Sequence, residues 1–270
     1  MGEITEHALP ALRARLRHVY WIGGGSGAGK STIARRVAGR HGLPVYSTDD
    51  AMRDHGGRFP PQEAPLLSRF NAMGMDERWV SRSPETMLES FHWFQGELFG
   101  LIVEDLLRFP AGTGVIAEGF RLLPRLVRPL LAEPGHAVWL LPTPGFRRAA
   151  FASRGSLWKI ADKTSDPERA LRNLLDRDRM FTELLRAETK RLELAAIKID
   201  TTMTEDDLTE RVTEAFELLT GTGHAAPGRG WSSPDFAAML MISRDPPDVR
   251  RSVQFWRFTA LWRSPTSHAR

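Results

Sequence analysis

The sequence predicts an α/β protein with a five-stranded parallel sheet and helices on both faces. Five short, mostly apolar runs occur before residue 220, helix-like patterns separate them, and glycines or carboxylates follow the first three. The predicted strands cover residues 18–22, 44–48, 114–117, 137–141 and 196–199. Strands that alternate with helices run parallel, so polar residues at their carboxyl ends gather at one edge of the sheet, where ligands bind.

The first two helices are predicted from their end signals and apolar periodicity. One covers residues 31–40 and is ended by Gly42. The other begins at Ser83 with Pro84 at its first position, and an apolar stripe extends it to Leu106 as one long helix.

Two later helices carry equally clear start signals. Asp166 caps one that runs to about Leu192, and Pro167 lies in its first turn. The last begins at Thr204, where Asp207 completes a capping-box pattern.

The chain changes character after Thr220. Glycine and proline become frequent, and most of the remaining residues show neither helical nor strand periodicity. The sequence therefore predicts a folded domain over residues 1–220, then a linker and irregular tail over residues 221–270.

Composition excludes several functional classes. The 270 residues include no cysteine, which rules out disulfides, thiolate metal sites and cysteine nucleophiles, and fits a cytoplasmic protein. No apolar run approaches the roughly 20 residues of a membrane span, and the acidic N-terminus does not resemble a signal peptide. The net charge of +4 arises in the tail and leaves residues 1–220 balanced, which disfavours nucleic acid as a partner.

A phosphate-binding pattern lies between the first strand and the first helix. It fits G-x-x-x-x-G-K-[ST], in which glycines let backbone amides wrap an anion and the helix N-terminus adds positive potential. The lysine reaches the β- and γ-phosphates and the hydroxyl joins a Mg²⁺ shell. A glycine-rich turn with a chance lysine is the alternative. The predicted nucleotide-binding residues are Gly24, Gly25, Ser26, Gly27, Ala28, Gly29, Lys30, Ser31 and Thr32.

This stretch is identified as a member of the P-loop nucleotide-binding superfamily. Over roughly residues 18–220 the chain resembles its small-molecule kinases: shikimate and gluconate kinases, chloramphenicol phosphotransferase, 2-phosphoglycerate kinase and zeta-toxin sugar-nucleotide kinases. The resemblance implies a P-loop NTP hydrolase fold of the nucleotide-kinase type, with ATP and Mg²⁺ as cofactors. It also implies transfer of the γ-phosphoryl group to a hydroxyl of a metabolite, sugar nucleotide or antibiotic.

Two adjacent aspartates end the second strand. Members of these families keep an aspartate here, often as D-x-x-R, facing the acceptor hydroxyl. Asp50 with Arg53 fits that spacing, which implies that Asp50 is the catalytic base or orienting group and Arg53 meets the acceptor. Asp49 is a second catalytic candidate and, with Ser31, a Mg²⁺ ligand, directly or through water. The alternative is an aspartate pair that caps the following helix.

The remaining site residues follow from the same resemblance. Glu118 ends the third strand in an E-G turn similar to that of the 2-phosphoglycerate-kinase and zeta-toxin sequences, where a carboxylate holds a metal-bound water. Arg121 then either meets an anionic acceptor or is a surface arginine. Arg154 belongs to a predicted lid over about residues 154–167, and Arg177 matches an acceptor-binding position.

Two functions remain open at the level of sequence. The first is a kinase for a small-molecule hydroxyl acceptor, in which Lys30 neutralises phosphate charge and Asp50 orients or deprotonates the acceptor. The alternative is a regulatory P-loop NTPase or nucleotide-sensing module that acts through a protein partner, with the tail as a docking segment. Neither the acceptor nor the oligomeric state follows from the sequence.

Overall fold

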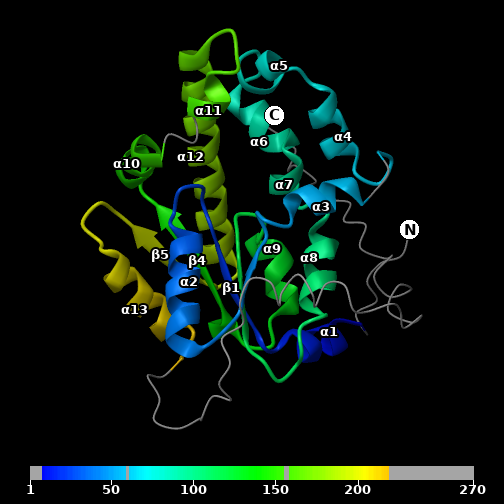
Figure 1. Ribbon diagram of the computed structural model, residues 1–270, viewed down its shortest axis with the longest axis vertical. Coiled ribbons are helices and arrows are strands. Elements are labelled where there is room, and N and C mark those ends of the chain that lie inside the picture. Colours follow the sequence, from blue (N-terminus) through cyan, green and yellow to red (C-terminus); the bar gives the residue numbers. More distant parts are fainter. Residues whose placement is uncertain (1–7, 59–60, 155–157, 219–270) are drawn as a thin grey trace, which may run out of the picture.

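A computed structural model of the chain describes residues 8–58, 61–154 and 158–218 (Figure 1). The predicted linker and tail over residues 221–270 lie outside these ranges. Five strands form one sheet in the order β2-β3-β1-β4-β5, and every neighbouring pair is parallel. The predicted five-stranded parallel α/β architecture is therefore confirmed. The strands are β1 Val19–Gly24, β2 Val45–Ser47, β3 Val115–Glu118, β4 Ala137–Pro142 and β5 Ala195–Ile199.

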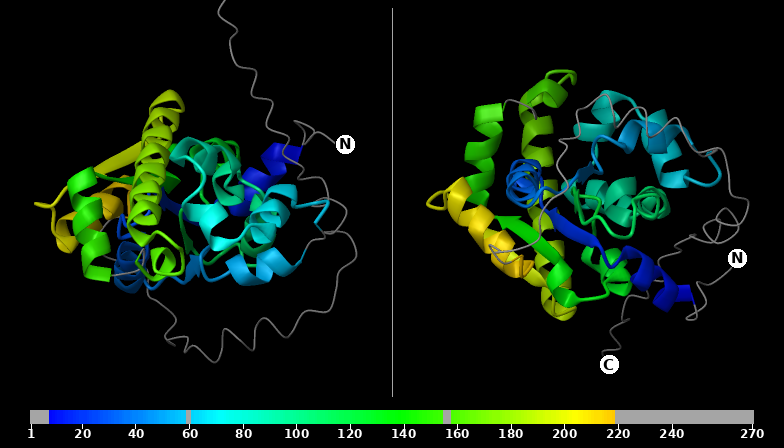
Figure 2. Two further views of the ribbon diagram at one scale, coloured as in Figure 1. Left: turned by 90° about the horizontal axis from the view of Figure 1, so that it is seen from above. Right: turned by 60° about the horizontal axis from the view of Figure 1, so that its bottom comes forward.

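Helices cover both faces of this sheet (Figure 2). Successive side chains of a strand point to opposite faces, so Trp21 packs toward α8, α9 and α12, whereas Ile22 packs toward α2 and α13. The buried indole of Trp139 donates to the Leu122 carbonyl at 2.8 Å. The helices on or near the sheet are α1 Ala8–Leu16, α2 Lys30–His41, α8 Phe99–Leu106, α9 Pro124–Val127, α10 Pro144–Arg154, α12 Pro167–Arg191 and α13 Glu205–Ala215.

The chain between β2 and β3 forms a group of short helices beside the carboxyl edge of the sheet (Figure 1). A third apolar cluster, which includes Trp79, Met87 and Leu174, packs this group against α12 and α11. The backbone N–H of Ser165, in the predicted lid, donates to Asp76 at 2.7 Å. The helices involved are α3 Met52–Gly57, α4 Pro65–Ala72, α5 Met75–Trp79, α6 Pro84–Ser90, α7 His92–Gln95 and α11 Trp158–Ala161.

The predicted helix from Ser83 to Leu106 is wrong as a single helix. The structure divides it into α6, α7 and α8, because Phe91 is extended and Gly96 and Leu98 have positive φ of 84° and 63°. Glu97, between the last two, caps α4 instead: its carboxylate accepts from the N–H groups of Leu66 and Leu67 at 2.9 and 2.7 Å. The apolar periodicity continued across these breaks, so it did not reveal them.

The predicted helix ends are confirmed. The Ser83 hydroxyl accepts from the Thr86 N–H at 3.3 Å, and the Asp166 carboxylate accepts from the Arg169 N–H at 3.0 Å. Thr204 and Asp207 form a reciprocal capping box. Gly42 ends α2 in the left-handed region with φ 66°. Among the described helices, none combines the length and apolarity needed to cross a bilayer.

The longest helix, α12, is anchored to α7 by an aromatic stack. The rings of Phe181 and Phe94 are parallel within 8°, with centroids 3.7 Å apart, and neither side chain is exposed by more than 1%. We expect Phe181→Ala to lower the free energy of unfolding by about 3–5 kcal/mol, because it removes a buried ring and leaves a cavity. Urea titration measures the loss, and Arg179→Ala, an exposed site on the same helix, is the control that should change it by less than about 0.5 kcal/mol.

Candidate phosphate-binding site

The loop between β1 and α2 has the backbone form that an anion cradle requires. Gly24, Gly27 and Gly29 adopt positive φ of 138°, 75° and 77°, a region that other residues rarely enter. Gly29 precedes α2, and no side chain caps this helix end among the described residues. An uncapped helix N-terminus favours a negatively charged group. The loop backbone is therefore suited to phosphate.

Lys30 lies within this loop rather than in solvent. Its side chain is buried, and its ammonium donates to the Gly25 carbonyl at 2.9 Å. Burial raises the pKa of both Asp49 and Glu118, and the positive charge of Lys30 opposes the rise in each, so this charge acts on both carboxylates. The structure thus brings the loop lysine together with two of the predicted acidic residues.

Glu118 is placed by the sheet register. β3 lies between β2 and β1, and Glu118 pairs with Ser47 on one side and Ile22 on the other. Its side chain is 1% exposed, and Oε2 has no hydrogen-bond partner within the described parts of the chain. Burial raises the pKa of the Glu118 carboxyl, while hydrogen bonding from Ser47 and the charge of Lys30 oppose the rise. A buried carboxylate oxygen without a donor is costly unless a ligand completes it.

The two aspartates occupy different environments. The Asp49 side chain reaches solvent, but the protein packed around it removes part of its hydration and raises the pKa of its carboxyl, while the charges of Lys30 and Arg121 oppose the rise. Asp50 is exposed, and its backbone N–H donates to the Ser47 hydroxyl at 3.4 Å. No side chain caps α3 in the described structure, and its N-cap is Ala51. The helix-capping alternative therefore gains no support.

Oxygen-bearing side chains near the loop could hold a hydrated Mg²⁺ ion. Within the described ranges no group of three or more His, Asp or Glu side chains is arranged to hold a metal. Ser31 lies in the first turn of α2, and its hydroxyl is among the groups that lower the pKa of Glu118 against the larger effect of burial. Mg²⁺ takes one or two protein ligands and completes its shell with water and phosphate oxygens. Ser31, Asp49 and Glu118 suit that mode of binding.

A pocket of about 380 Å³ opens beside the loop. It lies between the loop, the start of α10 and the connection from β5 to α13. Gly27, Ala28, Gly29 and Thr32 of this lining belong to the predicted nucleotide-binding residues. The lining residues are Gly27, Ala28, Gly29, Thr32, Ile33, Phe146, Ala149, Ala150, Ile199, Thr201, Met203, Thr204, Glu205 and Leu208.

Arg147 is a cation near the loop that was not predicted from the sequence. It lies on α10, is 3% exposed and hydrogen-bonds the Thr182 hydroxyl, which lies against Gly25. Its Nε has no partner among the described residues. Burial lowers the pKa of Arg147, and the charge of Asp178 opposes that change. The sequence signal that could have identified Arg147 is its position, about one helical turn after β4 at the carboxyl edge of the sheet.

Arg177 and Arg53 do not join the carboxylate cluster. Arg177 is buried, pairs with Asp178 at 2.7 Å, and lies over the rings of Trp79, Phe91 and Phe94 at 5.0–5.3 Å. Arg53 is exposed on α3.

Arg121 and Arg154 are the two remaining arginines that the sequence predicted for the site. Arg121 is not a surface residue, because it is 2% exposed beside the end of β2. The Arg154 side chain, in the predicted lid, lies outside the described residues.

A scan against protein-family models finds no match to this chain, and a search of curated proteins finds none either. The functional assignment therefore depends on the loop, its neighbours and their chemistry.

Lys30→Ala should abolish ATP turnover and weaken ATP binding by at least about 10-fold, because the lysine supplies charge to the phosphates. Isothermal titration calorimetry and an ATPase assay measure the two effects, with Lys198→Ala, an exposed lysine on β5, as the control. Wild-type binding and turnover by Lys30→Ala would refute the assignment of the loop.

Glu118→Gln should change how the stability of the ligand-free protein depends on pH. Relative to the unmodified chain, the variant should gain stability as the pH rises from acid to neutral. Because the pKa of Glu118 is raised in the folded chain, protonation favours folding, and stability is lost as pH rises through the unfolded and then the folded pKa. Glutamine cannot ionise and removes that loss. Urea titrations from pH 4 to 8 test this, and Glu183→Gln, an exposed site, should leave the pH profile unchanged.

Proposed function

We propose that this protein is an ATP-dependent phosphotransferase that moves the γ-phosphoryl group to a hydroxyl of a small molecule. The observation that carries the proposal is the convergence of the loop, the buried Lys30 and the carboxylates of Asp49 and Glu118 at one sheet edge. A glycine-rich turn with a chance lysine would not need acidic groups from two other strands beside it.

The nucleotide would lie along the loop. The loop amides and Lys30 contact its phosphates, and the 380 Å³ pocket beside Gly27 and Gly29 holds its base against Phe146 and Met203. This pocket is partly apolar and adjoins the start of α2, as a base attached to loop-bound phosphates requires. Arg147 adds positive charge near Gly25, on the side of the loop that faces α12.

Ser31, Asp49 and Glu118 are the residues that would hold a hydrated Mg²⁺ ion beside the loop. The ion, when bound, neutralises phosphate charge and orients the terminal phosphate. Burial disfavours the charged form of Glu118 and therefore raises the pKa of its carboxyl. A bound ion would offset this unfavourable burial of charge.

The acceptor would approach from the short helices between β2 and β3. Asp50 is exposed beside the cluster and accepts the proton of the acceptor hydroxyl as the oxygen forms its bond to the γ-phosphorus and the bond to ADP breaks. Arg53 lies one turn further along and Arg177 lies among the aromatic rings of the same region, so both are candidates to contact the acceptor.

Incubation with Mg²⁺, ATP and a library of hydroxyl metabolites and antibiotics should yield one product heavier by a single phosphoryl group. Mass spectrometry detects it, and Lys30→Ala is the negative control. ATP hydrolysis that responds to no acceptor but rises with a protein partner would favour the regulatory NTPase instead.

The two aspartates should divide the chemistry. Asp50→Asn should lower the transfer rate by about 10²–10⁴ and leave ATP affinity within a few-fold, because it removes the base and not a phosphate contact. Asp49→Asn should be milder and partly restored by excess Mg²⁺. Rates at several Mg²⁺ concentrations test both variants; a normal Asp50→Asn with an inactive Asp49→Asn would exchange their roles.

A further inference from the structure

Arg121 is held at the end of a sharp turn after β3. Gly119 has φ 147°, and the Thr48 side chain occupies the space that a Cβ on Gly119 would need. The turn leads the Arg121 side chain back across the end of β2, where Nη1 donates to the Thr48 carbonyl at 3.3 Å. A cation is thus buried against the residue that precedes Asp49 and Asp50.

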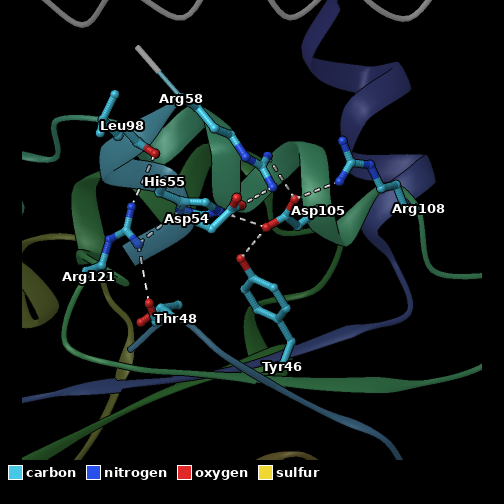
Figure 3. Close-up of polar contacts among 9 residues, drawn as sticks. All are labelled: Tyr46, Thr48, Asp54, His55, Arg58, Leu98, Asp105, Arg108 and Arg121. Atoms are coloured by element: carbon cyan, nitrogen blue, oxygen red, sulfur yellow. Dashed lines mark hydrogen bonds and ion pairs between the residues drawn. The ribbon is translucent and has the colours of Figure 1, made fainter. Parts of the chain in front are cut away.

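Three further contacts fix the guanidinium, and Figure 3 draws the two to His55 and Leu98. Nη1 also donates to His55 Nδ1 at 3.1 Å, and Nη2 donates to the Leu98 carbonyl at 3.4 Å. The guanidinium carbon lies 4.1 Å from the ring centre of Trp93. Leu98 adopts φ 63°, which is strained for a residue with a side chain. The structure retains this strain at a carbonyl that contacts Arg121.

The hydrogen bonds determine the state of His55. Arginine has no acceptor, so His55 Nδ1 must accept, and the neutral ring then carries its proton on Nε2. That N–H donates to Asp105 Oδ2 at 2.8 Å, and the imidazole is 0% exposed. Asp105 also accepts from the Tyr46 hydroxyl at 2.8 Å and from Arg108 at 3.0 Å (Figure 3). Asp105, His55 and Arg121 form a continuous chain, called here the Arg121 relay.

The Arg121 relay ends at the peptide group between Thr48 and Asp49. The Thr48 N–H donates to the Glu118 carbonyl at 2.9 Å, and the Thr48 carbonyl, part of the peptide bond to Asp49, accepts from Arg121. Both peptide groups of Thr48 are therefore held. Arg121 stays a cation, since burial lowers its pKa only to about 10, and its charge opposes the rise that loss of hydration causes in the pKa of Asp49.

We propose that Arg121 is a positioning residue for Asp49 and Asp50, and that His55 and Asp105 keep it in place. This inference rests on the proposed function for its effect on phosphoryl transfer. The relay joins α3 and α8 to the end of β2, so the short helices beside the acceptor region and the aspartates share one hydrogen-bonded chain. Its loss moves the carboxylates without removing a phosphate contact.

The decisive comparison is between two substitutions of His55. In His55→Asn the side-chain oxygen can take the place of Nδ1 and accept from Arg121, whereas in His55→Gln the polar atoms reach toward Asp105 instead. If the hydrogen bond from Arg121 to residue 55 positions the aspartates, kcat for ATP hydrolysis should be about 10-fold higher in His55→Asn than in His55→Gln. This is the effect of one hydrogen bond to a charged group. A relay that only supports the fold would affect both variants equally.

Arg121→Met should lower kcat by about 10- to 100-fold, the usual range for groups that orient a catalytic ligand, with ATP affinity within about twofold. Arg108→Met, which removes an exposed arginine from the same Asp105, should be indistinguishable from the unmodified chain. The readouts are kcat for Mg²⁺-dependent ATP hydrolysis to water, ATP affinity and melting temperature. The ¹⁵N shifts of His55 provide a fourth readout, expected to report an Nε2–H tautomer.

None of these readouts needs an acceptor. The experiment can therefore contradict the relay without contradicting the proposed function, and the reverse. Absence of any phosphorylated product from the unmodified chain, with hydrolysis that still depends on Arg121, overturns the transferase and supports the relay. An Nδ1–H tautomer, equal rates for the two His55 variants, or unchanged kcat in Arg121→Met overturns the relay. An unmodified chain that neither transfers nor hydrolyses phosphate overturns both.

Discussion

The parallel pairing of β2, β3 and β1 is the constraint on which the candidate site depends. Because the three strands run in one direction, Ser47, Glu118 and Ile22 lie side by side and the chain leaves all three strands at the same edge. The glycine-rich loop follows one strand, the aspartates follow another, and Glu118 ends the strand between them. Neither an antiparallel neighbour nor a register shifted by one residue would place these side chains together.

Several polar groups at this edge are buried without a full set of hydrogen-bond partners, which is energetically unfavourable. Glu118 Oε2, Arg147 Nε and Arg121 Nε all lack a partner in the described structure, although each lies in a well-packed region. Burial raises the pKa of Glu118 and lowers the pKa of Arg121 and Arg147, in each case against the charged form. Perturbed pKa values that cluster at the carboxyl edge of a parallel sheet mark this region as a candidate functional site.

Two buried arginines serve different parts of the molecule. Arg177 pairs with Asp178 among the aromatic rings that pack α12 against the short helices, whereas Arg121 connects those helices to the end of β2. Buried ion pairs seldom add net stability, since desolvation offsets their attraction, but they hold one arrangement against others. Arg177 has such a pair, whereas Arg121 acts through hydrogen bonds, and together they fix how the short helices meet the carboxyl edge of the sheet.

The sequence by itself determined the strands, their parallel direction, the loop around Lys30 and the caps at Ser83, Asp166 and Thr204, because each depends on neighbouring residues or on local periodicity. It also placed Glu118 and the aspartates at one edge, since parallel strands share their carboxyl ends. Only the tertiary structure decided the breaks after Ser90 and at Gly96, the hydrogen bond of Arg147 to Thr182 beside the loop, and the hydrogen bond of His55 to Asp105. Those features join segments up to 50 residues apart, where burial and hydrogen bonding override the local pattern.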